Sequence, residues 1–283
     1  NADAPNYRLM EINLATGRRR DIIPEGEHVL EGVSTAGDAL FAHYLIDAQN
    51  KVVQYDREGH ITREVSLPAI GTVGGFDGER EDTQVYYAVT NYTSPGTIYS
   101  YDIASGESTL YHAPQTKFDC SAYETRQIFF ESKDGTRVPM FVSHRKGLKL
   151  DGENPCYLYG YGGFQINMTP SFSSSMMMFM EQGGVYVVVN LRGGSEYGEQ
   201  WHKAGMLDKK QNVFDDFISA AEHLIAEGYT SSEKLAIAGG SNGGLLVGAC
   251  MTQRPDLFAV AIPAVGVLDM LRFHLFTIGH GWV

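Results

Sequence analysis

Ser241 lies in the pattern of this chain that has the clearest chemical meaning. The segment Gly239-Gly240-Ser241-Asn242-Gly243 places glycine on both sides of the serine, between the apolar run Leu235–Ala238 and a helix-forming stretch. A strand, a sharp turn and a helix in this order expose a serine hydroxyl at the carboxyl edge of a sheet. The turn is strained and neighbouring side chains would clash there, which explains the glycines. The pattern predicts that Ser241 is the nucleophile of an acyl-transfer reaction.

Acyl transfer also needs donors for the negative charge that develops on the substrate carbonyl oxygen. The backbone amide of Asn242 is the expected first donor, at the amino end of the following helix, which favours negative charge. A second donor should come from an earlier loop, and the candidate is Tyr157–Phe164, which is rich in glycine and tyrosine. From spacing alone, a structural glycine-aromatic turn is an equal alternative.

A serine nucleophile needs a histidine base that is oriented by a carboxylate. In α/β hydrolases the chain order is serine, acid, histidine. Asp269, His274 and His280 follow the serine and are weighed as candidates. We expect Asp269 at a helix start or on the surface, and the two histidines in partly buried structural positions. His202 and His223 precede the serine and break the order.

The elements around Ser241 indicate a parallel sheet with helices. A helix is predicted over 212–227, with Asn212 as its cap and Gly228 as its stop. A hairpin is predicted around Lys133-Asp134-Gly135, between strands at 127–131 and 138–143. Continuous apolar runs are typical of strands that are covered on both faces, and they occur at 156–161, 185–190, 235–238 and 259–263.

The first ~115 residues read instead as short strands with a repeat. The closing prolines Pro24, Pro68 and Pro114 are 44 and 46 residues apart, and each follows two strands around a glycine turn. An all-strand repeat of this length is typical of propeller blades. We therefore predict a partial β-propeller at 1–115, with whole blades at 25–68 and 69–114 and half a blade at 1–24. A partial α/β-hydrolase domain would follow at 116–283. A small β-sandwich is the alternative for the repeat.

Composition excludes some classes of function. The formal net charge of −12 disfavours nucleic acid as a partner, and no apolar run reaches the ~20 residues of a membrane span. The run Met176–Met180 is expected to be helix core. We expect no metal and no cofactor, and free thiols at the three widely spaced cysteines, which are Cys120, Cys156 and Cys250.

Several motifs in order resemble the prolyl oligopeptidase family of serine peptidases over about residues 118–283. They are Tyr159-Gly-Tyr161-Gly-Gly-Phe164, Asn190-Leu-Arg192-Gly-Gly-Ser-Glu-Tyr197-Gly, Trp201-His-Lys, Gly239-Gly-Ser241-Asn242-Gly-Gly and Arg254-Pro-Asp-Leu-Phe258. The blade repeat before them is consistent with the same family but less specific.

The resemblance implies a peptidase that cleaves short peptides on the carboxyl side of proline through an acyl-enzyme. Ser241 would attack the carbonyl, the Asn242 amide and the Tyr161 hydroxyl would bind the oxyanion, and Phe164, Val267 and Trp282 would line the proline pocket. A flat indole suits a proline ring, which has apolar faces and no N–H. Two alternatives stay open: an acylaminoacyl peptidase or esterase of the same fold, and a propeller interaction module without enzymatic activity.

The resemblance also bears on what the chain lacks. Both ends look like cuts, and the family's acid and histidine would lie beyond Val283, so we expect the triad Asp and His to be absent and the chain to be inactive alone. The intact enzyme would be a monomer that acts on short proline-containing peptides, with no membrane and no nucleic acid as partner. Its expected compartment is the cytoplasm, with the periplasm or secretion as alternatives.

Overall fold

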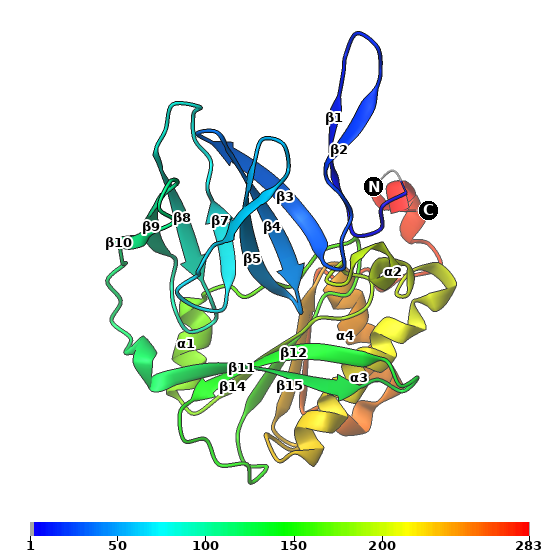
Figure 1. Cartoon of the computed structure of the whole chain (residues 1–283). Helices are drawn as coiled ribbons and strands as arrows, with labels where there is room; N and C mark the ends of the chain where they lie inside the picture. The colour runs from blue at the N-terminus through cyan, green and yellow to red at the C-terminus, as the bar shows by residue number, and fades with distance from the viewer. Residues whose placement is uncertain (1–2, 283) are drawn as a thin grey trace. The chain divides into compact units, whose positions relative to one another are not determined.

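The computed structural model describes residues 3–282, and the chain divides into two compact units (Figure 1). The first unit contains the chain up to Ser121 together with the short segments 169–174 and 196–200. The second unit contains 122–168, 175–195 and the chain from Trp201 onward. The main division therefore lies six residues after the boundary predicted at 115/116. Each unit is described by itself below.

The first unit consists of three separate antiparallel sheets. Two of them have four strands each, in the order of the sequence, and they lie within the segments 25–68 and 69–114 predicted as blades. The third is a two-stranded ribbon within 1–24, of which residues 1 and 2 lie outside the described residues. The ribbon consists of β1(Leu9–Ile12) and β2(Arg19–Ile23). One four-stranded sheet consists of β3(Val29–Ala36), β4(Ala39–Ile46), β5(Gln49–Asp56) and β6(Ile61–Glu64). The other consists of β7(Thr72–Gly75), β8(Gln84–Thr90), β9(Thr97–Asp102) and β10(Ser108–His112).

Buried aromatic rings fill the space between the two four-stranded sheets. The ring of Phe76 stacks on Phe41 of β4 at 5.0 Å and on Tyr87 of β8 at 4.6 Å between ring centroids. The hydroxyl of Tyr101 donates to Oε1 of the buried Gln54 at 2.6 Å, so the polar end of this ring is satisfied. Neither sheet could bury its inner face alone, which is the reason for stacking such units.

The second unit is built on one six-stranded sheet in the order β11-β12-β14-β13-β15-β16. The last four of these strands run parallel, as predicted from their continuous apolar runs. The predicted hairpin also forms, and its second strand pairs antiparallel with β14, a pairing that the sequence did not reveal. The strands are β11(Tyr123–Glu131), β12(Arg137–Arg145), β13(Cys156–Tyr159), β14(Val185–Val189), β15(Leu235–Gly240) and β16(Val260–Ala264).

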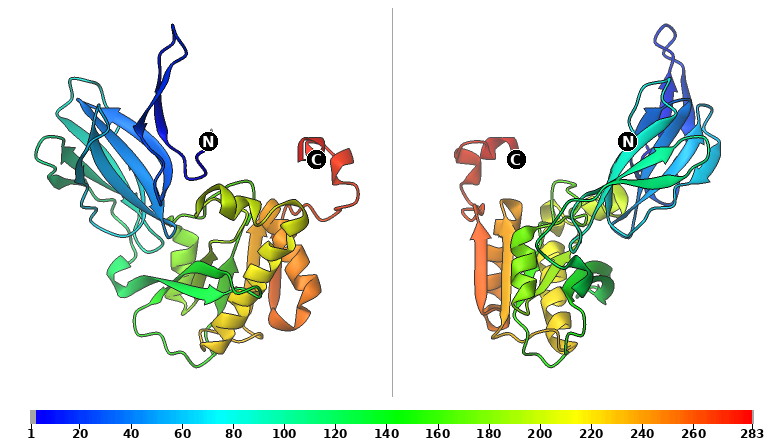
Figure 2. Two further views of the ribbon diagram at one scale, coloured as in Figure 1. Left: turned by 45° about the vertical axis from the view of Figure 1, so that its right-hand side comes forward. Right: turned by 90° about the vertical axis from the view of Figure 1, so that its left-hand side faces the viewer.

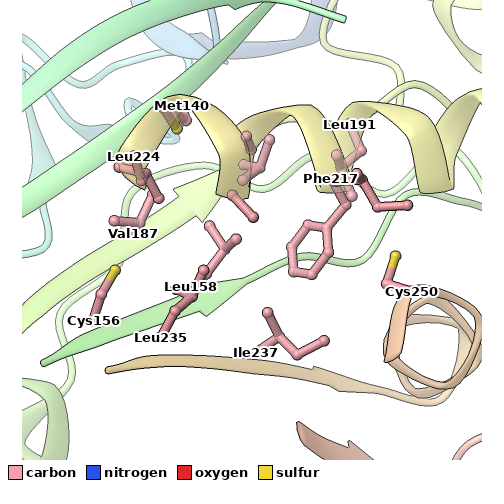
Figure 3. Packing of buried hydrophobic residues seen from close by; sticks show 14 of the residues in the cluster. Met140, Cys156, Leu158, Val187, Leu191, Phe217, Leu224, Leu235, Ile237 and Cys250 are labelled. Atoms are coloured by element: carbon pink, nitrogen blue, oxygen red, sulfur yellow. The ribbon is translucent and has the colours of Figure 1, made fainter. Parts of the chain in front are cut away.

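Helices cover both faces of this sheet. Buried side chains of α3 and α4 share one cluster with sheet residues such as Leu158, which Figure 3 shows from close by. On the opposite face, Tyr157 packs edge-on against Phe179 of α1 at 6.2 Å between ring centroids. In α1, Met177 and Met180 are buried, as expected for the methionine run. The helices are α1(Ser174–Glu181), α2(Gly198–Lys203), α3(Gln211–Ala226) and α4(Asn242–Gln253), with 3-10 turns η1(Cys120–Ala122), η2(Leu207–Lys209), η3(Pro255–Leu257), η4(Phe273–Leu275) and η5(Gly279–Trp282).

Two predictions about individual elements were wrong. Asn212 is not the cap of α3, because the helix begins one residue earlier and Asn212 donates its side-chain amide to the Ala204 carbonyl at 2.9 Å. The strand β16 is not covered on both faces, since it lies at the edge of the sheet (Figure 2) and Val260 is 50% exposed. Gly228, in contrast, ends α3 with a φ of +76°, as predicted.

Within residues 3–282, no helix has both the length and the apolar character that a membrane crossing requires.

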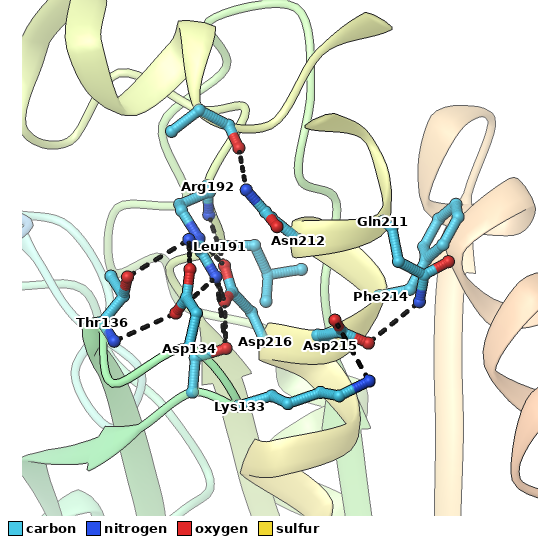
Figure 4. A network of polar contacts seen from close by, with 12 residues as sticks. Lys133, Asp134, Thr136, Leu191, Arg192, Gln211, Asn212, Phe214, Asp215 and Asp216 are labelled. Carbon is cyan, nitrogen blue, oxygen red and sulfur yellow. Dashed lines mark hydrogen bonds and ion pairs between the residues drawn. The ribbon is translucent and has the colours of Figure 1, made fainter. Parts of the chain in front are cut away.

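A buried ion-pair network holds the loop after β14 against α3 and the hairpin turn (Figure 4). Nε of Arg192 donates to both carboxylate oxygens of Asp216, at 3.0 and 3.1 Å, and the hydroxyl of Ser132 donates to the same carboxylate at 2.6 Å. The other end of the guanidinium reaches Asp134 and Thr136 in the turn. Burial raises the pKa of the Asp216 carboxyl, and the Arg192 guanidinium opposes that rise.

Replacing Asp216 by Asn should destabilise the fold by about 3–5 kcal/mol, because the buried Arg192 charge loses its main partner. The matched control is Asp215→Asn one position away, where the carboxylate makes a bond to Gln211 and a 3.9 Å contact with Lys133. That change should cost less than about 1 kcal/mol. Chemical denaturation of both variants and the wild type measures the difference. Equal unfolding free energies for the two variants would show that the network does not hold the loop.

Candidate active site

The turn after β15 presents Ser241 in a strained conformation. Its φ is +56° and its ψ is −113°, values that a side-chain-bearing residue adopts only when its surroundings enforce them. The backbone is fixed on both sides, since Ser241 N–H donates to the Ala264 carbonyl at 2.9 Å and α4 begins at the next residue. The Ser241 side chain is exposed, so its hydroxyl is available at the edge of the sheet.

Backbone crowding explains two of the glycines around the serine. A Cβ on Gly239 would lie 2.4 Å from the Gly243 carbonyl oxygen, and a Cβ on Gly243 would lie 2.6 Å from the Gly160 carbonyl oxygen. No side chain fits at either position. Gly240, directly before the serine, has open space around its Cβ position. We expected side chains to clash on both sides of the serine. That prediction is wrong for Gly240, and it holds for Gly239 and Gly243, the two glycines of the G-x-S-x-G pattern.

The loop that follows β13 reaches the same point because β13 and β15 are parallel neighbours. Tyr159 and Ala238 are register partners, so the carboxyl ends of the two strands meet at one edge of the sheet. From β13 the chain continues to β14 on one side, whereas β15 lies on the other side. Such a reversal of strand order is where α/β proteins place their ligands.

Tyr161 on this loop lies beside the serine. Its hydroxyl interacts with the Ser241 side chain. Burial raises the pKa of the Tyr161 hydroxyl and this interaction lowers the pKa by less, so the group stays protonated and able to donate at neutral pH. The Asn242 side chain is buried and donates Nδ2–H to the Tyr161 carbonyl at 2.6 Å. The structure thus brings together the serine, the residue after it and the tyrosine, the three groups that the sequence nominated for attack and oxyanion binding.

The residues proposed for a proline pocket also converge. A pocket of about 310 Å³ is lined by Ser241 and Asn242 together with Phe164, Val267 and Trp282. The rings of Phe164 and Trp282 meet edge to face, with centroids 6.2 Å apart. The other lining residues were not predicted to form a pocket, although Gly163 and His202 belong to motifs that carry the family resemblance. They are Gly163, His202, Gly205, Met206, Leu207, Lys210, Leu245, Met270 and Phe273.

The acidic and basic residues weighed as triad partners lie elsewhere. Asp269 forms an ion pair with Arg272 at 2.6 Å, in keeping with its expected surface role. His274 and His280, which belong to two 3-10 turns, are exposed, so their predicted partly buried positions were wrong. In residues 3–282, two histidines pair with a carboxylate, His60 with Asp56 and His144 with Glu124, and none of these four residues lines the pocket.

His202 does line the pocket, although its place in the chain order had set it aside. Its Nδ1 lies 2.8 Å from the Gly193 carbonyl oxygen, so that nitrogen carries a proton and donates. As for metals, the described part of the chain contains no cluster of three or more side chains that could hold an ion.

A parallel sheet whose strand β15 ends in an exposed serine on a strained turn defines the α/β-hydrolase class. The sequence profile of the Prolyl oligopeptidase family matches residues 170–283, and the profile of the Prolyl oligopeptidase N-terminal beta-propeller domain matches residues 1–114. These matches confirm the predicted fold class, a partial propeller followed by a partial α/β hydrolase. The chain belongs to the prolyl oligopeptidase family.

Relatives agree with this assignment over the whole chain. A prolyl endopeptidase from Elizabethkingia meningoseptica is 49% identical, and the alignment covers 99% of this chain and 40% of that protein. A prolyl endopeptidase from Dictyostelium discoideum is 42% identical, and the alignment covers 100% of this chain and 39% of that protein. A solved prolyl endopeptidase structure matches with a TM-score of 0.94 at 47% identity, covering 99% of this chain and 42% of that one. Prolyl oligopeptidase B from Galerina marginata, bound to a 35mer substrate, matches with a TM-score of 0.94 at 34% identity, covering 99% and 40%. The chain spans about 40% of the length of these relatives.

Replacing Gly239 by Ala should destabilise the second unit by about 2 kcal/mol or more, because the added methyl group meets two backbone carbonyls. Gly240→Ala is the matched control, with an expected change within about 0.5 kcal/mol. Denaturant unfolding followed by circular dichroism compares the two variants. Equal stability losses would contradict the claim that the outer glycines alone are sterically required.

Proposed function

We propose that the full-length protein containing this chain is a serine oligopeptidase that cleaves short peptides on the carboxyl side of proline. The observation that carries the proposal is the convergence of the exposed Ser241 hydroxyl with the Tyr161 hydroxyl and an aromatic pocket. A carbonyl carbon placed at Ser241 would have its oxygen near Tyr161 and its side chain in the pocket. The family assignment supports the same reaction class.

In the proposed reaction, Oγ of Ser241 forms a bond to the carbonyl carbon and its proton passes to a base. The resulting oxyanion accepts hydrogen bonds from the Tyr161 hydroxyl and the Asn242 amide at the start of α4, whose amino end carries partial positive charge. The bond to the leaving amine then breaks as that amine gains a proton, which leaves an ester on Ser241. Water hydrolyses the ester and restores the serine. Among residues 3–282, the pocket contains the proposed nucleophile Ser241 and Asn242, but no histidine that pairs with a carboxylate.

Proline suits the pocket for physical reasons. The flat apolar rings of Phe164 and Trp282, inclined to each other by 62°, line the pocket, and Val267 adds an aliphatic wall. A proline ring has two apolar faces and carries no N–H that would need a partner, so it loses little on leaving water. A cationic side chain would lose its hydration in the same space, where no carboxylate is among the lining residues.

The test of the proposal is hydrolysis of a fluorogenic Gly-Pro peptide by the full-length gene product. We expect turnover that is abolished in Ser241→Ala, and at least a 100-fold preference over the matching Gly-Ala peptide. The isolated 283-residue chain should show negligible turnover, because no activated base faces Ser241. A full-length protein that neither cleaves the Gly-Pro peptide nor reacts with a fluorophosphonate probe at Ser241 would refute the proposal. Robust turnover by the isolated chain would refute the assignment of the base to another part of the protein.

Tyr161→Phe in the full-length protein should lower kcat by about 100-fold to 1,000-fold and leave KM within about threefold. The lost hydroxyl stabilises the transition state more than the bound substrate. Tyr159→Phe, two residues earlier on the same strand and loop, is the matched control and should keep near wild-type kcat. Steady-state kinetics on the Gly-Pro peptide measure both variants. A Tyr161→Phe enzyme with unchanged kcat would exclude the hydroxyl as an oxyanion donor.

A further inference from the structure

A lysine with an unusual setting lies next to the serine. Lys210 directly precedes α3, and its Nζ donates to the Gly162 carbonyl at 2.8 Å and to Oδ1 of Asn242 at 3.0 Å. The same side chain lines the pocket that Ser241 lines. No carboxylate among residues 3–282 pairs with it, so two neutral oxygens are its partners. A cation before the first turn of a helix also opposes the helix dipole, which favours negative charge there.

The two bonds from Lys210 complete a chain that connects three separate segments. Asn242 accepts from Lys210 through Oδ1 and donates through Nδ2 to the Tyr161 carbonyl at 2.6 Å. The carbonyls of Tyr161 and Gly162 therefore accept from one amide, that of Asn242, and one ammonium, that of Lys210. The packing is tight, since a Cβ on Gly163 would lie 2.6 Å from Nδ2 of Asn242. The position of the Tyr161 loop relative to the serine turn thus depends on Lys210.

We propose that Lys210 is a positioning residue for oxyanion binding, which ties the Tyr161 loop to Asn242 and places a positive charge beside the developing oxyanion. The inference rests on the function proposed above and adds a residue to it. Its geometric basis is that Lys210 touches both the loop that carries one oxyanion donor and the residue that carries the other. Its electrostatic basis is that a cation without an opposite charge acts at full strength on nearby negative charge.

The protonation of Lys210 gives the proposal a distinctive pH dependence. Burial lowers the pKa of its ammonium to about 8, well below that of an exposed lysine. The charge is therefore present below pH 8 and is lost as the pH rises through 8, so the catalytic rate should fall over the same range. Other ionisable groups near this site are His202 in the same pocket, Tyr161 on the loop, Asp208, Lys209 and Asp215 on the flanking turn and helix, and Cys250 on α4, whose thiol pKa is raised by burial.

The experiment measures kcat and KM of the full-length gene product on the Gly-Pro peptide from pH 6.5 to 9.5. Lys210→Met should lower kcat by about 10-fold to 50-fold at pH 7 with KM within about threefold. Its rate should no longer fall between pH 7.5 and 9, whereas the wild-type rate should. Lys209→Met, which removes an exposed charge from the neighbouring position, should match the wild type within about twofold.

A second variant keeps the test decisive if Lys210→Met does not fold. Lys210→Arg keeps the charge at every pH of the series, so its rate should stay level between pH 7.5 and 9. Unchanged kcat and an unchanged pH profile in Lys210→Met, or a wild-type-like fall in Lys210→Arg, would overturn the inference. Fluorophosphonate labelling of Ser241 in the wild type separates the two hypotheses: labelling without an effect of Lys210 removes only the inference, and absence of labelling removes the proposed function itself.

Discussion

Direct contact between two stretches of backbone sets the geometry around Ser241. A Cβ on Gly239 would lie 2.8 Å from the Gly160 carbonyl oxygen, and the position on Gly243 is closer still. The turn after β15 and the loop after β13 therefore touch with no side chain between them. Because these strands are parallel neighbours in fixed register, the pairing of β13 with β15 determines where the loop and the serine turn lie relative to each other. A serine and a tyrosine that are 80 residues apart in sequence meet for this reason.

The Tyr161 loop is supported from behind by buried side chains. Leu191 lies against the Cβ positions of both Gly160 and Gly162, and its carbonyl accepts from the Trp201 indole at 3.0 Å. The next residue is Arg192, whose ion pair with Asp216 fixes this segment to α3. The interior of the second unit thus does more than stabilise the fold, because its packing determines how closely the loop approaches the serine. Precise placement of this kind is what preorganised oxyanion binding requires.

Contiguous patterns in the sequence predict part of the site, whereas contacts between residues that are distant in the sequence could not be predicted. The Ser241 turn could be predicted because its signal is contiguous in the sequence. That signal is an apolar strand, then glycines around the serine, then a helix. Tyr161 could be selected only through the family resemblance, since spacing alone left a structural turn equally open. Lys210 was missed because its partners Asn242 and Gly162 are 32 and 48 residues away, and only the fold brings them together. The exposure of β16 was missed because an apolar run does not reveal which strand is at an edge.

The two parts of the site are held in different ways. The groups proposed for attack and oxyanion binding rest on one part of the structure, and one wall of the pocket rests on another. The serine turn and the Tyr161 loop rest on the buried core of the second unit. The opposite wall of the pocket, with Phe273 and Trp282, belongs to 3-10 turns whose neighbours are largely exposed, such as Leu271 at 88%. Loops with few buried contacts tolerate substitution better than the elements that carry them. Under the proposed function, changes in that wall should therefore alter which side chain the pocket accepts while the geometry of attack and oxyanion binding stays the same.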